Sequence, residues 1–340
     1  MKIGIVSAGG DCPGINAAIR GVGKTAIVEY GMEVIGISNG FDGLIDMTYE
    51  SLPENRLSGI LTLGGTILGT SRMKPFKHQD GDTVKDKPQV IVENYHKLGL
   101  DALVCIGGNG TQQTANLLSK EGLNIVGLPK TIDNDVWGTD VTFGFDSAVH
   151  IATDAMDRLH TTANSHKRVM VIEVMGHNAG WIALHSGVAG GGDIILLPEI
   201  KYNMKVVAQA VMNRAEKGKP YSIVVVGEGI KVPKKKGAAQ YIGQQIFERT
   251  GMETRATILG YTQRGGTPTA GDRILATRFG SHAAELIHNK QFGRMVCITD
   301  NKIDSISLDE VGGKTKLVEK DNPLVKEARN MGVCFGDKCM

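Results

Sequence analysis

The stretch DALVCIGGNGTQQTANLLSKEGLNIVGLPKTIDND, residues 101–135, contains two short apolar segments separated by a glycine-rich turn and a helical pattern. Asp101–Ile106 and Asn124–Leu128 are nearly continuous in apolar residues, which is typical of strands buried on both faces of a sheet. Thr111–Glu121 has the spacing of apolar residues expected of a helix. This order of strand, helix and strand predicts parallel strands covered by a helix.

The same alternation runs through the rest of the chain. Further strand-like segments are Lys2–Ser7, Glu33–Ile37, Arg168–Val174, Asp193–Leu197, Ser222–Val226, Thr254–Leu259 and Arg294–Ile298. Helical patterns lie between them, at Ile15–Tyr30, Pro88–Leu98, Met204–Lys217 and Ala270–His288. We therefore expect an α/β fold in which mainly parallel sheets are flanked by helices. Nine strands in 340 residues indicate two similar lobes, with the active site in the cleft between them.

Composition narrows the classes of ligand. Charged residues make up 22% of the chain and the net charge is only +2, so we expect no broad basic surface for nucleic acid or membranes. The chain has 45 glycines, nearly double the average share of about 7%, and they gather at particular turns. Such turns bring backbone amides close to anionic ligands, which favours phosphate chemistry.

The cysteines and the N-terminal residues bear on the compartment. The five cysteines are odd in number and scattered along the chain, which favours reduced thiols. The N-terminal MKIGIVSAGG lacks the form of a signal peptide, and no apolar run approaches the ~18 residues needed to cross a membrane. We therefore expect a cytoplasmic protein that binds neither a membrane nor nucleic acid.

Two glycine-rich loops follow predicted strands. The first is SAGGDCPGINAAIR, residues 7–20, in which Gly9, Gly10 and Gly14 surround the turn. The second, GGNGT at Gly107–Thr111, opens the helix of the stretch quoted above. Ligands of parallel sheets bind at the carboxyl ends of strands, where such loops lead into helix N-termini and can hold phosphate. Each loop taken alone is also compatible with a plain turn, with Thr111 as a helix N-cap.

The segment PKTIDND, Pro129–Asp135, carries two carboxylates two residues apart. In an extended backbone, residues i and i+2 point the same way, so Asp133 and Asp135 are expected to face one pocket. One carboxylate can act as a base while the other binds a metal ion, as phosphoryl transfer requires. The alternative is a polar turn with surface carboxylates.

Six segments in the same order resemble the 6-phosphofructokinases. They are GGDCPGINAAIRG, GGTILGTSR, GGNGT, PKTIDND, EVMG at Glu173–Gly176, and ETRATILGYTQRGG at Glu253–Gly266. The resemblance covers essentially the whole chain. NAD kinases and diacylglycerol kinases share a loop related to GGNGT, but they are not expected to carry the TIDND and TQRGG segments as well.

This resemblance implies Mg²⁺-dependent, in-line phosphoryl transfer to the 1-hydroxyl of fructose 6-phosphate, a step of glycolysis. Asp133 would be the base, Thr131 would bond the transferred group or the sugar, and Arg72 would stabilise the migrating charge. The metal would lie near Asn109 and Asp135. The donor-binding residues would be Gly10, Arg72, Gly107, Gly108, Asn109, Gly110, Thr111 and Lys130.

The resemblance also implies how the sugar phosphate binds. Besides Thr131, Asp133 and Asp135, its residues would be Arg168, Met175, Gly176, Glu228, Arg255, Tyr261 and Arg264. Arg168 and Arg255 would come from a neighbouring subunit, so we expect a homo-oligomer, either a dimer or a tetramer. The larger, donor-binding lobe would comprise residues 1–144 and 257–307, and the smaller, sugar-phosphate lobe residues 145–256 and 308–340.

The chain departs from the usual family pattern at several positions. Asn109 replaces an aspartate expected near Mg²⁺, His177 replaces an arginine, and Tyr261 replaces a histidine. The donor motif is mixed, because Gly110 is typical of ATP-dependent members whereas Lys130 is typical of pyrophosphate-dependent ones. A carboxylate at position 110 is the element that excludes a nucleotide, so its absence favours ATP over pyrophosphate.

Other readings remain open at this point. Arg20, Lys24, Asp193, Lys217 and Lys219 occupy positions resembling an effector site, although Lys24 stands where an arginine is usual. The chain could instead be a regulatory subunit weakened by Asn109 and His177, or a kinase for another small molecule. The stretch from Leu308 onward has no motif that we can interpret.

Overall fold

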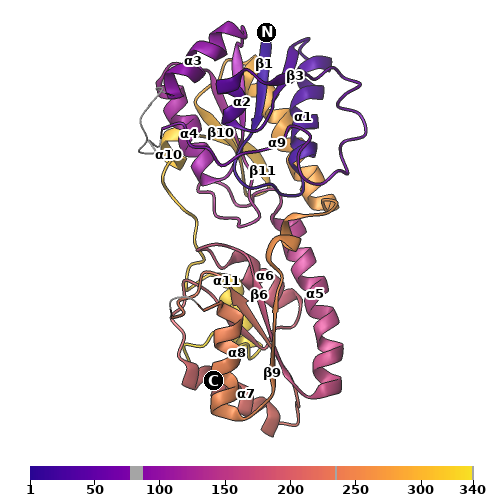
Figure 1. Cartoon of the computed structure of the whole chain (residues 1–340), viewed down its shortest axis with the longest axis vertical. Helices are drawn as coiled ribbons and strands as arrows, with labels where there is room; N and C mark the ends of the chain where they lie inside the picture. The colour runs from indigo at the N-terminus through magenta and orange to yellow at the C-terminus, as the bar shows by residue number, and fades with distance from the viewer. Residues whose placement is uncertain (77–86, 234–235, 339–340) are drawn as a thin grey trace. The chain divides into compact units, whose positions relative to one another are not determined.

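The computed structural model describes residues 1–76, 87–233 and 236–338, which form two compact units (Figure 1). Unit 1 comprises Met1–Thr131, Asp135–Asp146 and Arg264–Lys316, and unit 2 comprises Ile132–Asn134, Ser147–Gln263 and Leu317–Met340. Both units are α/β, with mostly parallel strands flanked by helices, which confirms the predicted fold class. Over the described ranges, no helix combines the length and apolar character needed to cross a membrane.

Unit 1 is built on a seven-stranded sheet in the order β11-β10-β5-β4-β1-β2-β3. Its strands are β1 (Lys2–Ser7), β2 (Glu33–Ile37), β3 (Tyr49–Ser51), β4 (Ala102–Gly107), β5 (Ile125–Pro129), β10 (Arg294–Thr299) and β11 (Lys302–Ser307). The five inner strands are parallel, and the edge strands β3 and β11 are antiparallel to their neighbours. Strands β1, β4 and β5 are buried along almost their whole length, as their apolar runs predict.

The two edge strands are absent from the sequence prediction, because neither has a continuous apolar run. β11 alternates exposed and partly buried residues, as expected where one face and one edge meet solvent. It pairs with β10 through a tight turn at Asp300 and Asn301, which both have positive φ.

Helices cover the sheet of unit 1. They are α1 (Ile15–Val28), α2 (Phe41–Asp46), α3 (Lys87–Lys97), α4 (Asn109–Lys120), α9 (Ala270–His288) and α10 (Leu308–Val311). Helices α1 and α9 pack closely because glycines line their contact: a side chain on Gly21 would lie 2.7 Å from the Thr277 carbonyl oxygen, and one on Gly280 would lie 2.5 Å from that of Ala18.

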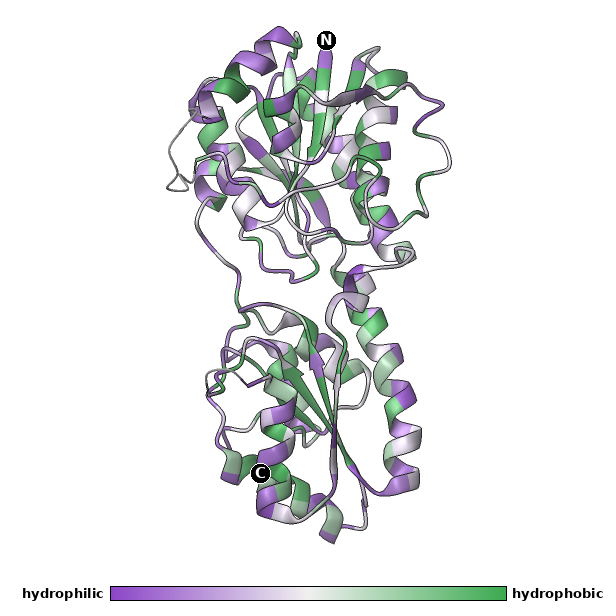
Figure 2. Cartoon of the chain, in the orientation of Figure 1, coloured by the Kyte–Doolittle hydropathy of each residue, from purple (hydrophilic) through white to green (hydrophobic). Residues whose placement is uncertain are grey.

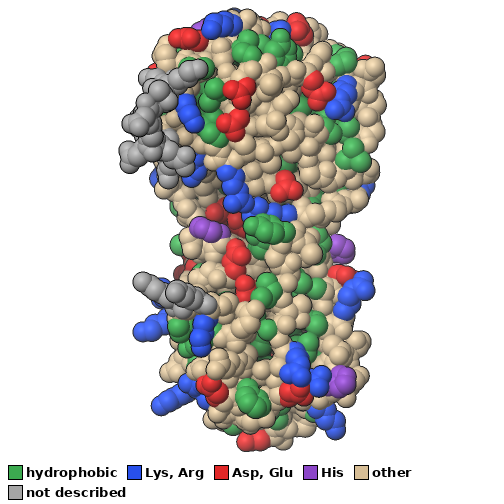
Figure 3. All heavy atoms as spheres, viewed as in Figure 1, with side chains coloured by type: hydrophobic (Ala, Val, Ile, Leu, Met, Phe, Trp, Pro, Cys, Tyr) green, Lys and Arg blue, Asp and Glu red, His purple; other side chains and the backbone are tan. Residues whose placement is uncertain are grey.

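Unit 2 contains a parallel four-stranded sheet in the order β7-β8-β6-β9. Its strands are β6 (Val169–Val174), β7 (Ile194–Leu196), β8 (Ser222–Gly227) and β9 (Thr254–Ile258). The helical elements are most of α5 (Phe145–His166), α6 (Trp181–Ala189), α7 (Met204–Glu216), α8 (Ala238–Thr250), α11 (Pro323–Asn330) and the 3₁₀ turn η1 (Gly260–Arg264). Hydrophobic residues concentrate on the strands inside each unit (Figure 2), whereas basic and acidic side chains are interspersed on the face drawn in Figure 3.

The unit boundaries differ from the expected lobe boundaries in four segments, of which residues 132–134, in unit 2, and residues 145–146, in unit 1, are short. Residues 308–316 belong to unit 1, because α10 packs against α4 and the following residues pair with the segment after Asp135. Residues 257–263 belong to unit 2, where the side-chain oxygen of Gln263 accepts a hydrogen bond of 3.2 Å from the Met175 amide.

Candidate active site

Three loops meet at one edge of the unit 1 sheet. The loops follow β1, β4 and β5, and these strands are neighbours, with Ser7 in register with Ile106 and Gly107 in register with Pro129. Because all three strands are parallel, their carboxyl ends point to the same edge. The two glycine-rich loops and the start of the TIDND segment therefore lie side by side.

The first glycine loop is fixed to the segment that carries Arg72. The Gly9 amide donates a hydrogen bond of 2.8 Å to the Ser71 carbonyl, and the Thr70 hydroxyl donates one of 2.8 Å to the Gly9 carbonyl. Arg72 follows directly and is exposed. A flexible, solvent-accessible guanidinium is thus held next to a loop of backbone amides, an arrangement suited to phosphate.

Lys130 connects the first loop with the third. Its side chain is only 3% exposed, and its Nζ donates a hydrogen bond to the Gly10 carbonyl. Its amide also donates one of 3.0 Å to the Gly107 carbonyl. Lys130 therefore contacts both glycine-rich loops, one through its side chain and the other through its main chain.

Helix α4 begins at Asn109, two residues before the predicted start. Its N-cap is Gly108, and no side chain caps the helix. The Thr111 hydroxyl instead donates a 3.3 Å hydrogen bond to the Ala8 carbonyl, so Thr111 is not the N-cap. A side chain on Gly107 would lie 2.2 Å from the Thr111 hydroxyl oxygen, which explains the need for glycine. The first-turn amides of an uncapped helix are suited to an anion.

Asn109 and Asp135 form a direct pair. The Asn109 Nδ2 donates to the Asp135 carboxylate at 2.9 Å and to the Asp135 carbonyl at 3.2 Å. The Asn109 Oδ1 is buried and has no hydrogen-bond partner within the part of the chain that the structure describes. A buried amide oxygen without a donor, beside a carboxylate, is suited to a hard cation such as Mg²⁺.

The described residues leave space around Gly110. Among them, a side chain added at this position would meet only the end of Lys74, with Cε at 3.5 Å and Nζ at 3.6 Å. Because Lys74 is exposed and its side chain can move, this contact would not keep a ligand out of the space near Gly110. Lys74 is a cation that the sequence analysis missed, and its place two residues after Arg72 was the available signal.

The backbone around the candidate base is not extended. Asn134 has a φ of 51°, in the left-handed region, so the alternation expected of an extended strand does not apply to Asp133 and Asp135. The predicted extended backbone is therefore wrong, whereas the shared pocket of Asp133 and Asp135 stays a prediction. Thr131 and Asp135 belong to unit 1, whereas Asp133, which is half-buried, belongs to the short segment Ile132–Asn134 counted with unit 2.

Cys12 lies in the first loop but is not suited to nucleophilic chemistry. Its thiol is buried and donates to the Phe143 carbonyl at 3.6 Å. Burial raises the pKa of the Cys12 thiol to about 12, and the nearby Lys130 charge opposes this only in part. The thiol is therefore neutral at physiological pH.

Arg264 lies against the first glycine loop. A side chain on Gly10 would stand 2.6 Å from an Arg264 guanidinium nitrogen, so the guanidinium packs over the bare Cα of that glycine. Of the arginines predicted to bind the sugar phosphate, Arg264 is the one that belongs to unit 1.

Three residues expected to bind the sugar part of the substrate, here called the sugar-ring residues, lie at the carboxyl ends of the unit 2 strands. Met175 and Gly176 follow β6, and Glu228 follows β8. The Glu228 carboxylate accepts a 2.9 Å hydrogen bond from the His177 amide, which joins the two loops. Tyr261 lies after β9 and is 72% exposed.

Arg168 and Arg255 lie at the opposite, amino end of the same sheet. Val169 is in register with Thr254, so the residues before β6 and β9 are neighbours. Glu253 pairs with both arginines, accepting from Arg168 Nε at 2.7 Å. The hydrogen bond from Arg168, and then the charges of both arginines, hold the pKa of the Glu253 carboxyl below its usual value.

The length of β6 separates these arginines from the sugar-ring residues. The strand has six residues, which corresponds to roughly 20 Å at about 3.3 Å per residue. One chain therefore does not bring Arg168 or Arg255 to Met175 and Glu228.

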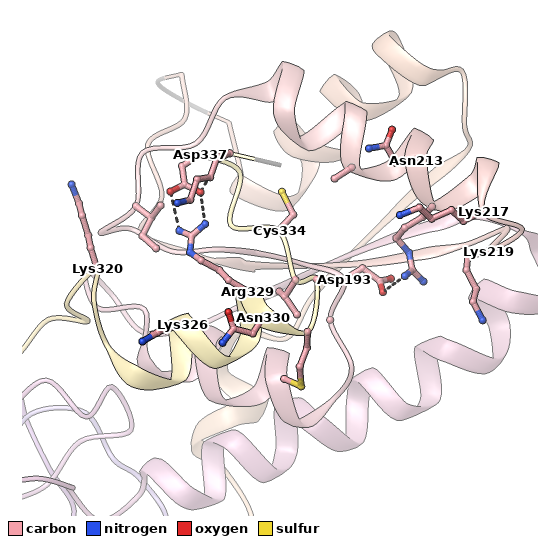
Figure 4. Close-up of a pocket in the computed structure, with 18 of the residues that line it drawn as sticks. Asp193, Asn213, Lys217, Lys219, Lys320, Lys326, Arg329, Asn330, Cys334 and Asp337 are labelled. Atoms are coloured by element: carbon pink, nitrogen blue, oxygen red, sulfur yellow. Dashed lines mark hydrogen bonds and ion pairs between the residues drawn. The ribbon is translucent and has the colours of Figure 1, made fainter. Parts of the chain in front are cut away.

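Three of the predicted effector residues share one cavity of unit 2, of about 1280 Å³ (Figure 4). Its lining includes Asp193, Lys217, Lys219, Lys326 and Arg329. Asp193 pairs with Arg214 at 2.9 Å, and burial raises the pKa of its carboxyl. The other two predicted residues, Arg20 and Lys24, lie on α1 of unit 1.

Comparison with known proteins agrees with this geometry. The family model described as "Phosphofructokinase" matches residues 2–287. The ATP-dependent 6-phosphofructokinase 3 of Bacteroides thetaiotaomicron is 62% identical over 336 residues, covering 99% of this chain and 100% of that protein. The ATP-dependent 6-phosphofructokinase of Spirochaeta thermophila is 55% identical over 358 residues, covering 98% of this chain and 97% of that protein.

A solved phosphofructokinase structure is also similar to this chain. Phosphofructokinase from Pichia pastoris in the T-state superposes with a TM-score of 0.84 at 34% identity, covering 91% of this chain and 35% of that longer chain. The matched family model, the identity over the full length of these relatives and the shared fold show that the chain belongs to the phosphofructokinase family.

Proposed function

We propose that the chain transfers the terminal phosphoryl group of ATP to the 1-hydroxyl of fructose 6-phosphate, with Mg²⁺. The observation that carries this proposal is the meeting of two glycine-rich loops and the Asn109–Asp135 pair at one edge of the unit 1 sheet. These loops supply the backbone amides, cations and oxygen ligands that phosphoryl transfer uses. The names of the relatives, ATP-dependent 6-phosphofructokinases, support the same reaction.

The donor is ATP rather than pyrophosphate. Space around Gly110 is open, so the start of α4 presents no carboxylate to a nucleotide. Lys130, the residue that matches the pyrophosphate pattern, is buried and donates to the Gly10 carbonyl, which supports a role in holding the loops. The relatives reported above carry ATP in their names, which also disfavours the pyrophosphate alternative.

The residues present fit a divalent metal. Mg²⁺ is usually held by one or two protein oxygens together with substrate phosphates and water, and Asp135 with the Asn109 Oδ1 can supply these oxygens. When bound, Mg²⁺ would supply positive charge that offsets the negative charge of the phosphate groups. The amide of Asn109 keeps the Asp135 carboxylate oriented by donating to it, although it lacks the charge of an aspartate.

The protein residues have distinct roles in the transfer. Asp133 accepts the proton of the 1-hydroxyl, while Thr131 positions the reacting groups. Arg72 and the amides near Gly10 stabilise charge on the transferred group, because donors aimed at phosphate oxygens act most strongly where charge develops. Gly107, Gly108, Gly110 and Thr111 shape the nucleotide side of the site.

The sugar-phosphate site is completed by a second copy of the chain. Met175, Gly176, Glu228 and Tyr261 follow the carboxyl ends of the unit 2 strands, whereas Arg168 precedes β6 and Arg255 is the second residue of β9, at the amino end of the sheet. A neighbouring subunit can supply the two arginines that the strand length keeps away from the same chain's ring contacts. The active form is therefore a homo-oligomer, and Arg264 is its cation from the same chain.

The test is a comparison of donors. Purified protein is incubated with fructose 6-phosphate and Mg²⁺, with ATP or pyrophosphate in parallel, and fructose 1,6-bisphosphate is measured. Turnover with ATP and little with pyrophosphate is expected. Preference for pyrophosphate would overturn the donor assignment, and no turnover with either would favour the regulatory-subunit alternative.

A further inference from the structure

We infer that Lys316 is a positioning residue that holds the turn from Asp135 to Asp140 and thereby fixes Asp135 for phosphoryl transfer. Lys316 lies in the C-terminal stretch for which the sequence offered no motif. The inference rests on the proposed function, because it assigns Lys316 a role through Asp135.

The main chain of Lys316 contacts Asp135 directly. The Lys316 amide donates a 2.8 Å hydrogen bond to the Asp135 carbonyl, and Thr315 forms an antiparallel bridge with Val136. The segment 315–316 therefore lies alongside the residues that follow the candidate base.

The side chain of Lys316 holds the far end of the same turn. Its Nζ donates to the Thr139 carbonyl at 2.8 Å and to the Asp140 carbonyl at 2.7 Å. The Asp140 amide is in turn anchored to the Ile298 carbonyl of β10 at 2.8 Å. Lys316 thus contacts both ends of the turn, and the Asp140 amide ties the far end to the sheet.

Asp135 is held from two sides as a result. Its carbonyl accepts from the Lys316 amide and from the Asn109 side chain, and its carboxylate accepts from Asn109 as well. Loss of the Lys316 ammonium would leave the far end of the turn bonded to Ile298 but would remove the two bonds that join it to the segment contacting Asp135.

A lysine is costly at this position, which supports a role beyond packing. The Lys316 side chain is partly buried, so its charged end loses part of its hydration. An apolar side chain would avoid the desolvation cost but would leave two carbonyls without this donor. The ammonium, with three donors, can bond both carbonyls at once.

The experiment compares K316M and K316R with the control K290M. Lys290 is exposed and follows α9 in the same unit, so K290M removes an equal charge at a site far along the chain from the turn. For each protein, amide hydrogen exchange of residues 131–140, thermal unfolding, kcat, the KM for fructose 6-phosphate and the Mg²⁺ concentration for half-maximal rate are measured.

K316M is expected to speed amide exchange in residues 135–140. It should also lower kcat and raise the Mg²⁺ concentration for half-maximal rate, so that the ratio of the two falls by roughly 10- to 100-fold. The KM for fructose 6-phosphate should change less than kcat, because Asp135 is the one residue expected to bind the sugar phosphate that lies in this turn. K316R should recover part of the loss, since a guanidinium can donate to both carbonyls. K290M should match the wild type in all readouts.

Three outcomes separate the possibilities. A K316M protein with a lower unfolding temperature but unchanged exchange and Mg²⁺ dependence would overturn the inference, because Lys316 would then be only structural. If K316M does not fold, K316Q is judged by the same two readouts. If the wild type has no ATP-driven turnover, the proposed function fails, while the exchange result still decides whether Lys316 holds the turn.

Discussion

Lys130 in the loop after β5 donates a hydrogen bond from its Nζ to the carbonyl of Gly10 in the loop after β1. The two residues are 120 positions apart in the sequence, and the bond joins two of the loops that form the candidate donor site. The buried ammonium therefore acts as a brace inside unit 1.

Lys130→Met is expected to weaken both the fold and the reaction. The substitution leaves the Gly10 carbonyl without this donor, which should cost about 1–3 kcal/mol of unfolding free energy. The kcat with ATP should fall by roughly tenfold or more, because the loop amides lose their fixed position. Chemical denaturation and steady-state kinetics measure the two effects.

The matched control for Lys130 is Lys97→Met. Lys97 is exposed in α3 of the same unit and, among the residues that the structure describes, forms only a long surface ion pair with Glu93, so its loss should change stability by less than about 0.5 kcal/mol. If Lys130→Met spares stability and ATP turnover but abolishes pyrophosphate turnover, Lys130 is a donor ligand and not a brace.

Gly110→Asp should lower ATP use without lowering stability. A carboxylate in the first turn of α4 is favourable for the helix, with a typical gain of about 0.3–1 kcal/mol. The same charge would repel the phosphates of a nucleotide in the space around Gly110. We expect a large rise in the KM for ATP together with an unchanged or higher unfolding temperature.

Gly110→Ala serves as the control for this position, because a methyl group meets only the flexible end of Lys74. ATP turnover by the alanine variant should stay near that of the wild type. ATP kinetics of Gly110→Asp that equal those of Gly110→Ala would show that the nucleotide does not pass close to this position.

Mixed oligomers of Asp133→Asn and Arg255→Ala chains test the shared site. Asp133→Asn alone should lower kcat by roughly 10²- to 10⁴-fold, the usual contribution of a general base. Arg255→Ala alone should raise the KM for fructose 6-phosphate while sparing that for ATP. Coexpressed chains should regain turnover, because some sites in a hybrid combine an intact Asp133 with an intact Arg255.

The hybrid experiment has a clear negative result. Turnover of the mixture equal to the sum of the two separate variants would mean that both residues act within one chain. Size-exclusion chromatography of the coexpressed sample, with a different tag on each chain, verifies that hybrids formed.

Glu253→Gln should alter the acid limb of the stability profile. The arginine contacts lower the pKa of the Glu253 carboxyl in the folded chain below its ordinary value of 4.5. A depressed carboxyl pKa contributes stability that is present above the unfolded pKa and lost as pH falls through the folded value. The variant should therefore be less stable than the wild type near neutral pH and converge with it in acid.

Thermal unfolding across this pH range measures the effect, which should be small because the Glu253 side chain is solvent-exposed in the single chain. Glu248→Gln is the control, because within the described ranges this exposed carboxylate of α8 bonds only glutamine side chains. Parallel curves for wild type and Glu253→Gln at all pH values would show that the arginine pairing does not form in solution.

The sequence alone determined the buried strands and the loops that follow them. Runs of apolar residues at β1, β4 and β5 predict strands because a segment buried on both faces has no use for polar side chains. The alternation with helices predicts parallel strands, and parallel strands place the loops at one edge. These are local patterns, so they can be read without knowing the neighbours in space.

The tertiary structure decided what local patterns do not contain. Asn134 has a left-handed backbone conformation, which changes the direction of the chain there. β11 is an edge strand whose polar residues give no continuous apolar run, so its sequence does not predict its pairing with β10. The contacts of Lys130 with Gly10 and of Lys316 with Asp140 span 120 and 176 residues. Such contacts depend on the order of the strands in the folded sheet. That order brings together segments that are far apart in the chain, and neither segment's own sequence indicates its partner.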